Sequence, residues 1–155
     1  MYNYIKNKFK QLPDGFYTAA TIVAAAQINY AIVHSSFVYV VLLIMLAHEL
    51  AHYFIGKYYK GKAKLPFFIP IPFFIIGITR VSKLSPFGKK NTALAGPLVG
   101  LLSAVLIMLY NYINTFMSFV PLFVLAISEI ITNYFGSDGA KYKQAKKEMK
   151  ACISY

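Results

Sequence analysis

The sequence is short of the residues that keep a soluble domain in water. Only 14% of its 155 residues are charged and 58% are hydrophobic, and the mean hydropathy is +0.55. Ordinary soluble domains hold about 25% charged and about 45–50% apolar residues. The composition therefore excludes an ordinary soluble globular protein, and the high apolar content also excludes intrinsic disorder.

Cysteine, histidine and acidic residues are also scarce, which limits the chemistry. The single Cys152 excludes an internal disulfide and any zinc site built from several cysteines. Only 3 histidines and 5 acidic residues remain as metal ligands. The net charge is +11, but the basic residues stand between long apolar runs. This arrangement favours a membrane protein in contact with the lipid bilayer over a nucleic-acid-binding protein.

Four apolar segments reach or approach the length of about 20 residues that a membrane-spanning helix needs. They are 16–33, 37–59, 92–113 and 116–135. Very short links join the first to the second and the third to the fourth, so each pair is expected to form a helical hairpin. No Lys or Arg lies in either link. The positive-inside rule then predicts a single α-helical membrane domain, 1–155, with four transmembrane helices and both termini in the cytosol, in the cell membrane.

The segment 65–79, between the second and third spans, is apolar but cannot be a helix. Its sequence, LPFFIPIPFFIIGIT, contains three prolines within seven residues, and one proline inside a helix costs about 3 kcal/mol or more. Basic residues stand on both sides of it. We expect a re-entrant hairpin of short extended strands, with a hydrophobic loop on the membrane surface as the alternative. The tail 141–155 is expected to form a short basic helix at the inner membrane surface.

The second span contains the sequence His48-Glu49-Leu50-Ala51-His52. Histidines four residues apart share one helix face and can bind one Zn²⁺, and the intervening glutamate can act as a base toward metal-bound water. Ionisable residues inside a spanning helix are costly and rare unless they are functional. The motif therefore predicts His48 and His52 as metal ligands and Glu49 as the catalytic base.

A catalytic zinc site needs a third protein ligand. His34 lies in the expected outer loop, on the wrong side of the membrane, which leaves Asp138 and Glu129 as candidates. Asp138 stands between Gly136 and Gly139, where the helix can break. On straight helices Asp138 would lie roughly 9 Å from the depth of His48. Unwinding near Gly136 would close this gap; otherwise Glu129 is the better ligand.

Four pieces of the sequence, in this order, resemble the site-2 proteases, which are intramembrane zinc metalloproteases. The pieces are HELAH at 48–52, PFFIPIPFFIIG at 66–77, NTALAGPLVG at 91–100 and SDG at 137–139. They are similar to the family's metal-binding helix, re-entrant β segment, third core helix and Asp-Gly motif. The resemblance implies a minimal form without a PDZ domain, with Asp138 as the third ligand. The chain departs from the family in having Ser137 before the aspartate and no proline near Asn133.

The resulting hypothesis is a zinc endopeptidase with one Zn²⁺ per chain that cuts a membrane-embedded or membrane-associated peptide near the cytosolic side. We expect an unwound substrate to add as a strand to the segment 65–79 and Gly96-Pro97 to allow close helix packing. The predicted substrate contacts are Phe68, Ile69, Ile71 and Phe73, together with Asn133, whose role the resemblance implies. An inactive scaffold, chaperone or immunity protein of the same fold is the main alternative, which the intact Glu49 disfavours. A transporter or metal channel is a third.

Overall fold

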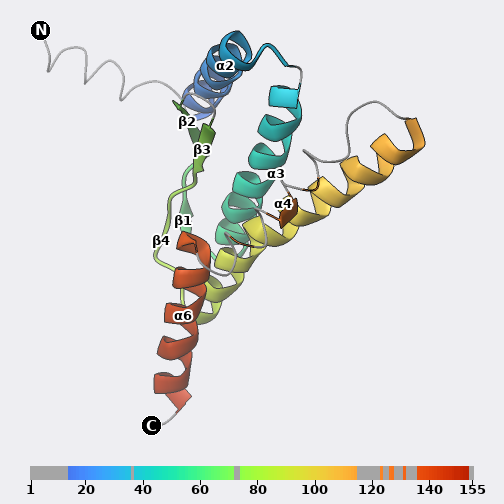
Figure 1. The fold of residues 1–155 in the computed structure, drawn as a ribbon. Helices are drawn as coiled ribbons and strands as arrows, with labels where there is room; N and C mark the ends of the chain where they lie inside the picture. Colours follow the sequence, from blue (N-terminus) through green and yellow to red (C-terminus); the bar gives the residue numbers. More distant parts are fainter. Residues whose placement is uncertain are drawn as a thin grey trace, which may run out of the picture.

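A computed structural model gives the fold (Figure 1). It describes residues 14–35, 37–71, 74–114 and 136–153, together with Phe123, Ala126, Ile127 and Ile131. These residues form a mostly helical structure with a two-stranded β ribbon.

The chain begins with two helices joined by a short link. α2 spans Asp14–Val33 and α3 spans Phe37–Tyr58. His34, in the link, has a positive φ of 49° and its N–H donates to the carbonyl of Tyr30, which closes α2. Ser35 caps α3, because its Oγ accepts from the N–H of Phe37 at 3.2 Å. The two helices agree with the expected segments 16–33 and 37–59.

The segment after α3 forms a long antiparallel ribbon. β1 (Lys62–Ala63) pairs with β4 (Val81–Ser82), and β2 (Phe67–Ile71) pairs with β3 (Phe74–Ile78). The pairing shifts by one residue between the two halves, since Lys62 faces Ser82 but Phe67 faces Ile78. This shift falls at Pro66, which has no N–H to donate to a ladder. The expected extended hairpin is therefore confirmed, whereas its depth in a membrane stays a prediction.

The last two helices lie beside α3. α4 spans Pro86–Asn114 and α6 spans Ser137–Ile153. α4 begins six residues before the expected 92–113, because Ser85 caps it by accepting from the N–H of Gly88 and Pro86 occupies the first turn. The hydropathy pattern missed this polar first turn. α6 confirms the expected basic helix at 141–155 and starts slightly earlier.

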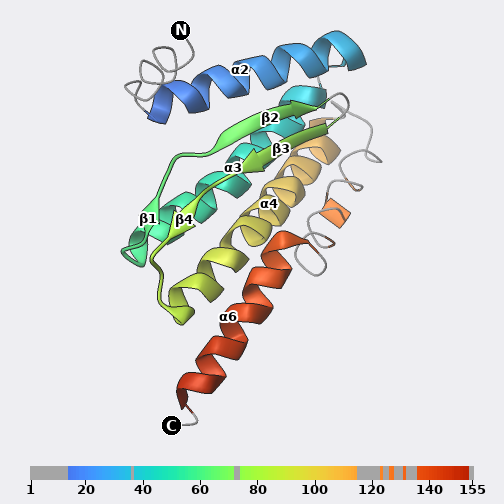
Figure 2. The same ribbon diagram turned by 90° about the vertical axis from the view of Figure 1, so that its left-hand side faces the viewer.

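Two small apolar cores lie on opposite sides of α3. In the first, Phe68 of β2 packs with residues of α2 and α3, namely Ala25, Ala26, Val38 and Leu42. In the second, Ile44 of α3 packs with Ala104 of α4 and with Ala126. Figure 2 shows the same order of layers: α2 crosses the ribbon at one end, the ribbon lies over α3, and α4 and α6 follow. α3 is therefore the central element that both sides share.

Two described helices are long and apolar enough to cross a membrane, namely α3 and the part Pro86–Tyr110 of α4. In each, 39% of the most apolar window is buried, and two such helices by themselves are weak evidence for a membrane protein. α2 does not reach the same hydropathy, and it carries the buried, polar Asn29. The expected fourth span, 116–135, lies outside the described residues except for four helical positions.

Candidate metal centre

The two histidines of the motif continue the apolar row of α3 that faces α4. Ile44, His48 and His52 are spaced four residues apart, so they lie on one helix face. Both imidazoles are buried, and their Nε2 atoms lie 3.2 Å apart. The helix face whose Ile44 packs in the second core thus continues with His48 and His52, whose Nε2 atoms point toward each other.

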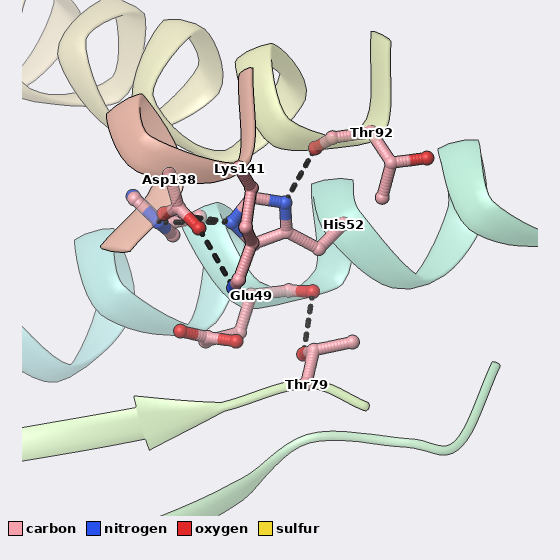
Figure 3. A network of polar contacts seen from close by, with 7 residues as sticks. Glu49, His52, Thr79, Thr92, Asp138 and Lys141 are labelled. Carbon is pink, nitrogen blue, oxygen red and sulfur yellow. Dashed lines mark hydrogen bonds and ion pairs between the residues drawn. The ribbon is translucent and has the colours of Figure 1, made fainter. Parts of the chain in front are cut away.

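Asp138 meets these histidines from α6. Its Oδ2 lies 3.2 Å from Nε2 of His52 and 3.4 Å from Nε2 of His48 (Figure 3). α6 begins after a bend at Gly136, whose carbonyl accepts from the N–H of Ala140. Asp138 therefore stands in the first turn of a new helix, where the helix dipole favours a negative charge. A bend therefore lies at Gly136, and among the residues that the structure describes Asp138 is the acid that joins the two histidines.

The donor set fits a metal ion. Around a tetrahedral zinc with bonds of about 2.0–2.2 Å, neighbouring ligand atoms are about 3.3–3.5 Å apart, close to the separations of the three atoms here. Within the part of the chain that the structure describes, His48, His52 and Asp138 are the group that could hold a metal ion. Lone pairs on two nitrogens and a carboxylate oxygen repel each other at this range unless a proton or a metal ion lies between them. The chemistry therefore supports a metal site, without identifying the metal.

Gly96 of α4 leaves the space that this cluster needs. A Cβ atom on Gly96 would come closer than 3.0 Å to the Nε2 atoms of both histidines. Any side chain at this position would occupy the region toward which the ligands converge. The close packing expected at Gly96 is therefore confirmed. The missing side chain leaves room for the imidazoles of His48 and His52.

A backbone carbonyl sets the orientation of His52. Nδ1 of His52 lies 2.6 Å from the carbonyl oxygen of Thr92 (Figure 3), so Nδ1 carries the proton and Nε2 keeps its lone pair for a metal. No sequence pattern predicts this contact, because a carbonyl oxygen is present at every residue. α4 thus contributes both the space at Gly96 and the group that selects the tautomer.

Lys141 and the histidines hold the carboxylate of Asp138 in its ionised form. Burial raises the pKa of Asp138, but hydrogen bonds from His48 and His52 and the nearby charge of Lys141 outweigh it and hold the pKa below its ordinary value. Nζ of Lys141 lies 3.2 Å from Oδ1 and leaves Oδ2 to the histidines. Asp138 is therefore arranged to offer one oxygen to a metal.

Glu49 lies on the neighbouring face of α3, toward the ribbon. It is buried, and its side chain packs on Gly77 of β3, where a Cβ atom would come closer than 3.0 Å to the carboxylate. The hydroxyl of Thr79 donates to the backbone carbonyl of Glu49 at 3.0 Å and ties the ribbon to α3 here (Figure 3). Glu49 and His52 of α3 and Asp138 of α6 therefore meet beside one cavity.

The cavity has a volume of about 1040 Å³ and lies between the ribbon, α3, α4 and α6. Glu49, His52 and Asp138 line it on one side, and residues 76–82 of the ribbon line another. Binding sites for drug-sized ligands have volumes of about 300–1000 Å³. This cavity is therefore large enough for several residues of an extended peptide.

The cavity lining does not include Phe68 or Ile69, two of the predicted substrate contacts. Phe68 is 1% exposed and packs in the first core, which makes it a core residue in this structure and corrects its expected role. Ile69 is exposed and does not line the cavity, and the backbone of Ile71 lies in β2. Phe73 and Asn133 lie outside the described residues.

The two edges of the ribbon explain this outcome. On the β2 edge, Thr18 donates to the carbonyl of Pro66 and Thr21 accepts from the N–H of Phe68, so α2 already occupies that edge. The N–H of Phe68 donates to Thr21 and therefore points away from β3. Phe68 and Gly77 are thus a non-hydrogen-bonded pair of the antiparallel ladder. The backbone groups of Gly77 and Ile75 therefore point to the other edge of β3, where no described strand pairs. The edge beside Glu49 belongs to β3, not β2.

Of the two other candidate ligands, the structure describes only His34, which is not part of the cluster. His34 is exposed in the link between α2 and α3, as the charge pattern predicts. Glu129 lies outside the described residues. Comparison of the chain with family models, with curated proteins and with solved structures finds no match. The geometry of the site therefore has to carry the functional argument alone.

Proposed function

We propose that the chain is an intramembrane zinc endopeptidase of the site-2 protease type, which hydrolyses a peptide bond in a membrane-embedded or membrane-associated peptide near the cytosolic side. The observation that carries this proposal is the convergence of Nε2 of His48, Nε2 of His52 and Oδ2 of Asp138 within 3.4 Å. A buried Glu49 stands beside these atoms at the same cavity. Two imidazoles and one carboxylate form a donor set typical of catalytic zinc.

In this proposal each residue has a separate task. His48, His52 and Asp138 hold one zinc ion per chain. When bound, zinc supplies Lewis acidity, which lowers the pKa of water to about 7 and polarises a carbonyl. Glu49 accepts the proton from the attacking water and passes it to the leaving amine, so that hydrolysis ends with a carboxylate and a free amine. Gly77 keeps the carboxylate of Glu49 in place by leaving room for it.

The substrate strand is expected at the free edge of β3. Its outward N–H and C=O groups at Ile75 and Gly77 can pair with an extended peptide. Gly77 contacts Glu49, so a peptide held here would lie beside the metal centre. A helical substrate hides its carbonyls in its own hydrogen bonds, and pairing with β3 would compensate for the bonds lost when it unwinds.

The proposed membrane arrangement has four spans, at 16–33, 37–59, 92–113 and 116–135, with the ribbon re-entrant and both termini in the cytosol of a multi-pass cell-membrane protein. The outward side of α4 supports it, since Leu98, Leu102, Leu106 and Leu109 are all more than half exposed. In water such a surface would be costly. The ribbon supports it as well, because it changes from apolar residues in β2 and β3 to basic residues near β1 and β4.

The test begins with metal content and continues with one substitution. Elemental analysis of detergent-purified protein should find about one zinc per chain. Glu49→Gln should keep that zinc and lower the hydrolysis of a membrane peptide by about 10²–10⁴-fold. A chain that binds no zinc when zinc is supplied would refute the proposal. A partner whose binding and fate are unchanged by Glu49→Gln would indicate the inactive scaffold instead.

A further inference from the structure

The cavity beside the metal centre is lined by an excess of positive charge. Its basic residues come from the ribbon, α4 and α6, and they are Lys62, Lys64, Arg80, Lys89 and Lys141. Its acidic residues are Glu49 and Asp138, both of which belong to the metal centre. Apart from Glu49 and Asp138, all charged residues in the described lining of the cavity are therefore basic.

Two of these cations already have acidic partners. Lys89 lies 2.8 Å from Glu148 on α6, and Lys141 lies 3.2 Å from Asp138. Among the residues that the structure describes, no carboxylate forms an ion pair with the three cations on the ribbon, Lys62, Lys64 and Arg80. The unbalanced charge is thus concentrated at the β1–β4 end of the cavity.

The ribbon holds these cations together at a cost. The N–H of Lys64 donates to the carbonyl of Arg80 at 3.0 Å, so the two cationic residues lie opposite each other on neighbouring strands. Lys62 of β1 lies two residues before Lys64, which follows the strand, and both residues are exposed. Like charges placed opposite each other destabilise a ribbon. An anionic ligand would relieve this repulsion.

We propose that the cavity selects peptides that carry acidic side chains on the segment leading from the metal centre to the β1–β4 end. This proposal rests on the proposed function, since it describes the substrate of that site. From Gly77, beside Glu49, the ribbon runs three residues to Arg80 and five to Ser82, which faces Lys62. A peptide that follows the same strand at about 3.3 Å per residue would place residues three to five positions from the scissile bond next to these cations.

The test measures peptide binding to the full chain in nanodiscs of zwitterionic phosphatidylcholine. The Glu49→Gln variant is used so that no product forms. Labelled peptides share one apolar segment and differ only at the third to fifth flanking positions, which carry Glu, Gln or Lys. We expect the Glu peptide to bind about fivefold more tightly than the Gln peptide at low salt, with the difference shrinking as salt is added.

Paired substitutions then test whether Lys62 and Lys64 cause the preference for the Glu peptide. In the Glu49→Gln background, Lys62→Glu with Lys64→Glu should invert the order of the Glu and Lys peptides, and Lys62→Gln with Lys64→Gln should remove the preference. The matched control is Lys146→Glu with Lys147→Glu, which changes the net charge equally on exposed positions of α6 outside the cavity lining. The control should keep the preference for the Glu peptide.

Three results would overturn the proposal. The first is equal binding of Glu and Gln peptides, and the second is an equal loss of preference in the control pair. The third is loss of the preference in nanodiscs that contain anionic phosphatidylglycerol, which would assign the cations to lipid headgroups. Cleavage of the same peptides by the unsubstituted chain is scored separately. Acid-selective binding without cleavage would refute the protease, whereas cleavage without charge preference would refute only this inference.

Discussion

The two faces of α3 differ in what they contribute to the site. The face toward α4 and α6 ends in His48 and His52 and meets Asp138, so it assembles the metal ligands. The face toward the ribbon ends in Glu49, which packs on Gly77. The motif places both functions within five residues, but the helix turns them toward different neighbours. Metal binding and proton transfer are therefore supported by separate contacts and can be broken separately.

Each of these two faces of α3 packs against a glycine of a neighbouring element. Gly96 of α4 leaves room for the two histidines, and Gly77 of β3 leaves room for Glu49. Adding one methyl group at each position gives a matched pair of perturbations, because the change is chemically identical. The predicted outcomes differ: one should affect the metal and the other should affect only turnover.

The largest expected effect is that of Gly96→Ala. The new Cβ would approach both Nε2 atoms closer than 3.0 Å, so zinc affinity should fall by more than about 100-fold. Elemental analysis and competition with a chelator measure this. Gly88→Ala on the same helix is the control, since its nearest contact would be 3.1 Å from Cβ of Tyr59 and far from the cluster. Retention of full zinc by Gly96→Ala would show that the ligands bind metal elsewhere.

Zinc affinity should also depend steeply on pH. Each imidazole must lose its proton to bind metal, whereas Asp138 stays ionised because its pKa lies below the ordinary value. Because protons compete with zinc for the two imidazoles, affinity should fall as the pH falls, with a slope of at most about two protons per zinc. A chelator titration at several pH values measures the slope. A slope near three would mean that Asp138 titrates together with the histidines.

Gly77→Ala should lower turnover without changing metal binding. Its Cβ would displace the carboxylate of Glu49, so kcat should fall by about 10–100-fold while the zinc content stays at one per chain. Ile69→Ala, at an exposed position of the neighbouring strand β2 that does not line the cavity, is the control and should leave both quantities unchanged. Loss of zinc in Gly77→Ala would show that the ribbon supports the metal as well.

The smallest effect is expected at the closed edge of the ribbon. Thr21→Val removes the oxygen that accepts from the N–H of Phe68 and should lower the free energy of unfolding by about 1–3 kcal/mol. Unfolding in detergent measures the loss, and Thr21→Ser, which keeps the hydroxyl, should restore most of it. Zinc content and kcat at a temperature where the protein is folded should not change. A change in kcat would contradict the division between the two edges.

Much of the fold was predictable because periodic or strongly biased residues produced it. The apolar runs predicted α2 and α3 within two residues at each end, and the prolines of 65–79 excluded a helix and predicted strands. The start of α4 was missed, since Ser85 and Pro86 lie outside the apolar run that marks the helix. For the third ligand, helix length alone left Glu129 open, because a bend such as that at Gly136 changes where the following residues lie.

The sequence by itself determined the local chemistry: an apolar chain with few acids, two histidines on one helix turn and a glutamate between them. Only the tertiary structure decided which groups this chemistry meets. Asp138 reaches His52 although the two are 86 positions apart in the sequence, Thr92 selects the tautomer of His52 through a backbone carbonyl, and β3 rather than β2 borders Glu49. The physical reason is that spacing along a helix fixes the direction of its own side chains, whereas contacts between elements depend on how they pack.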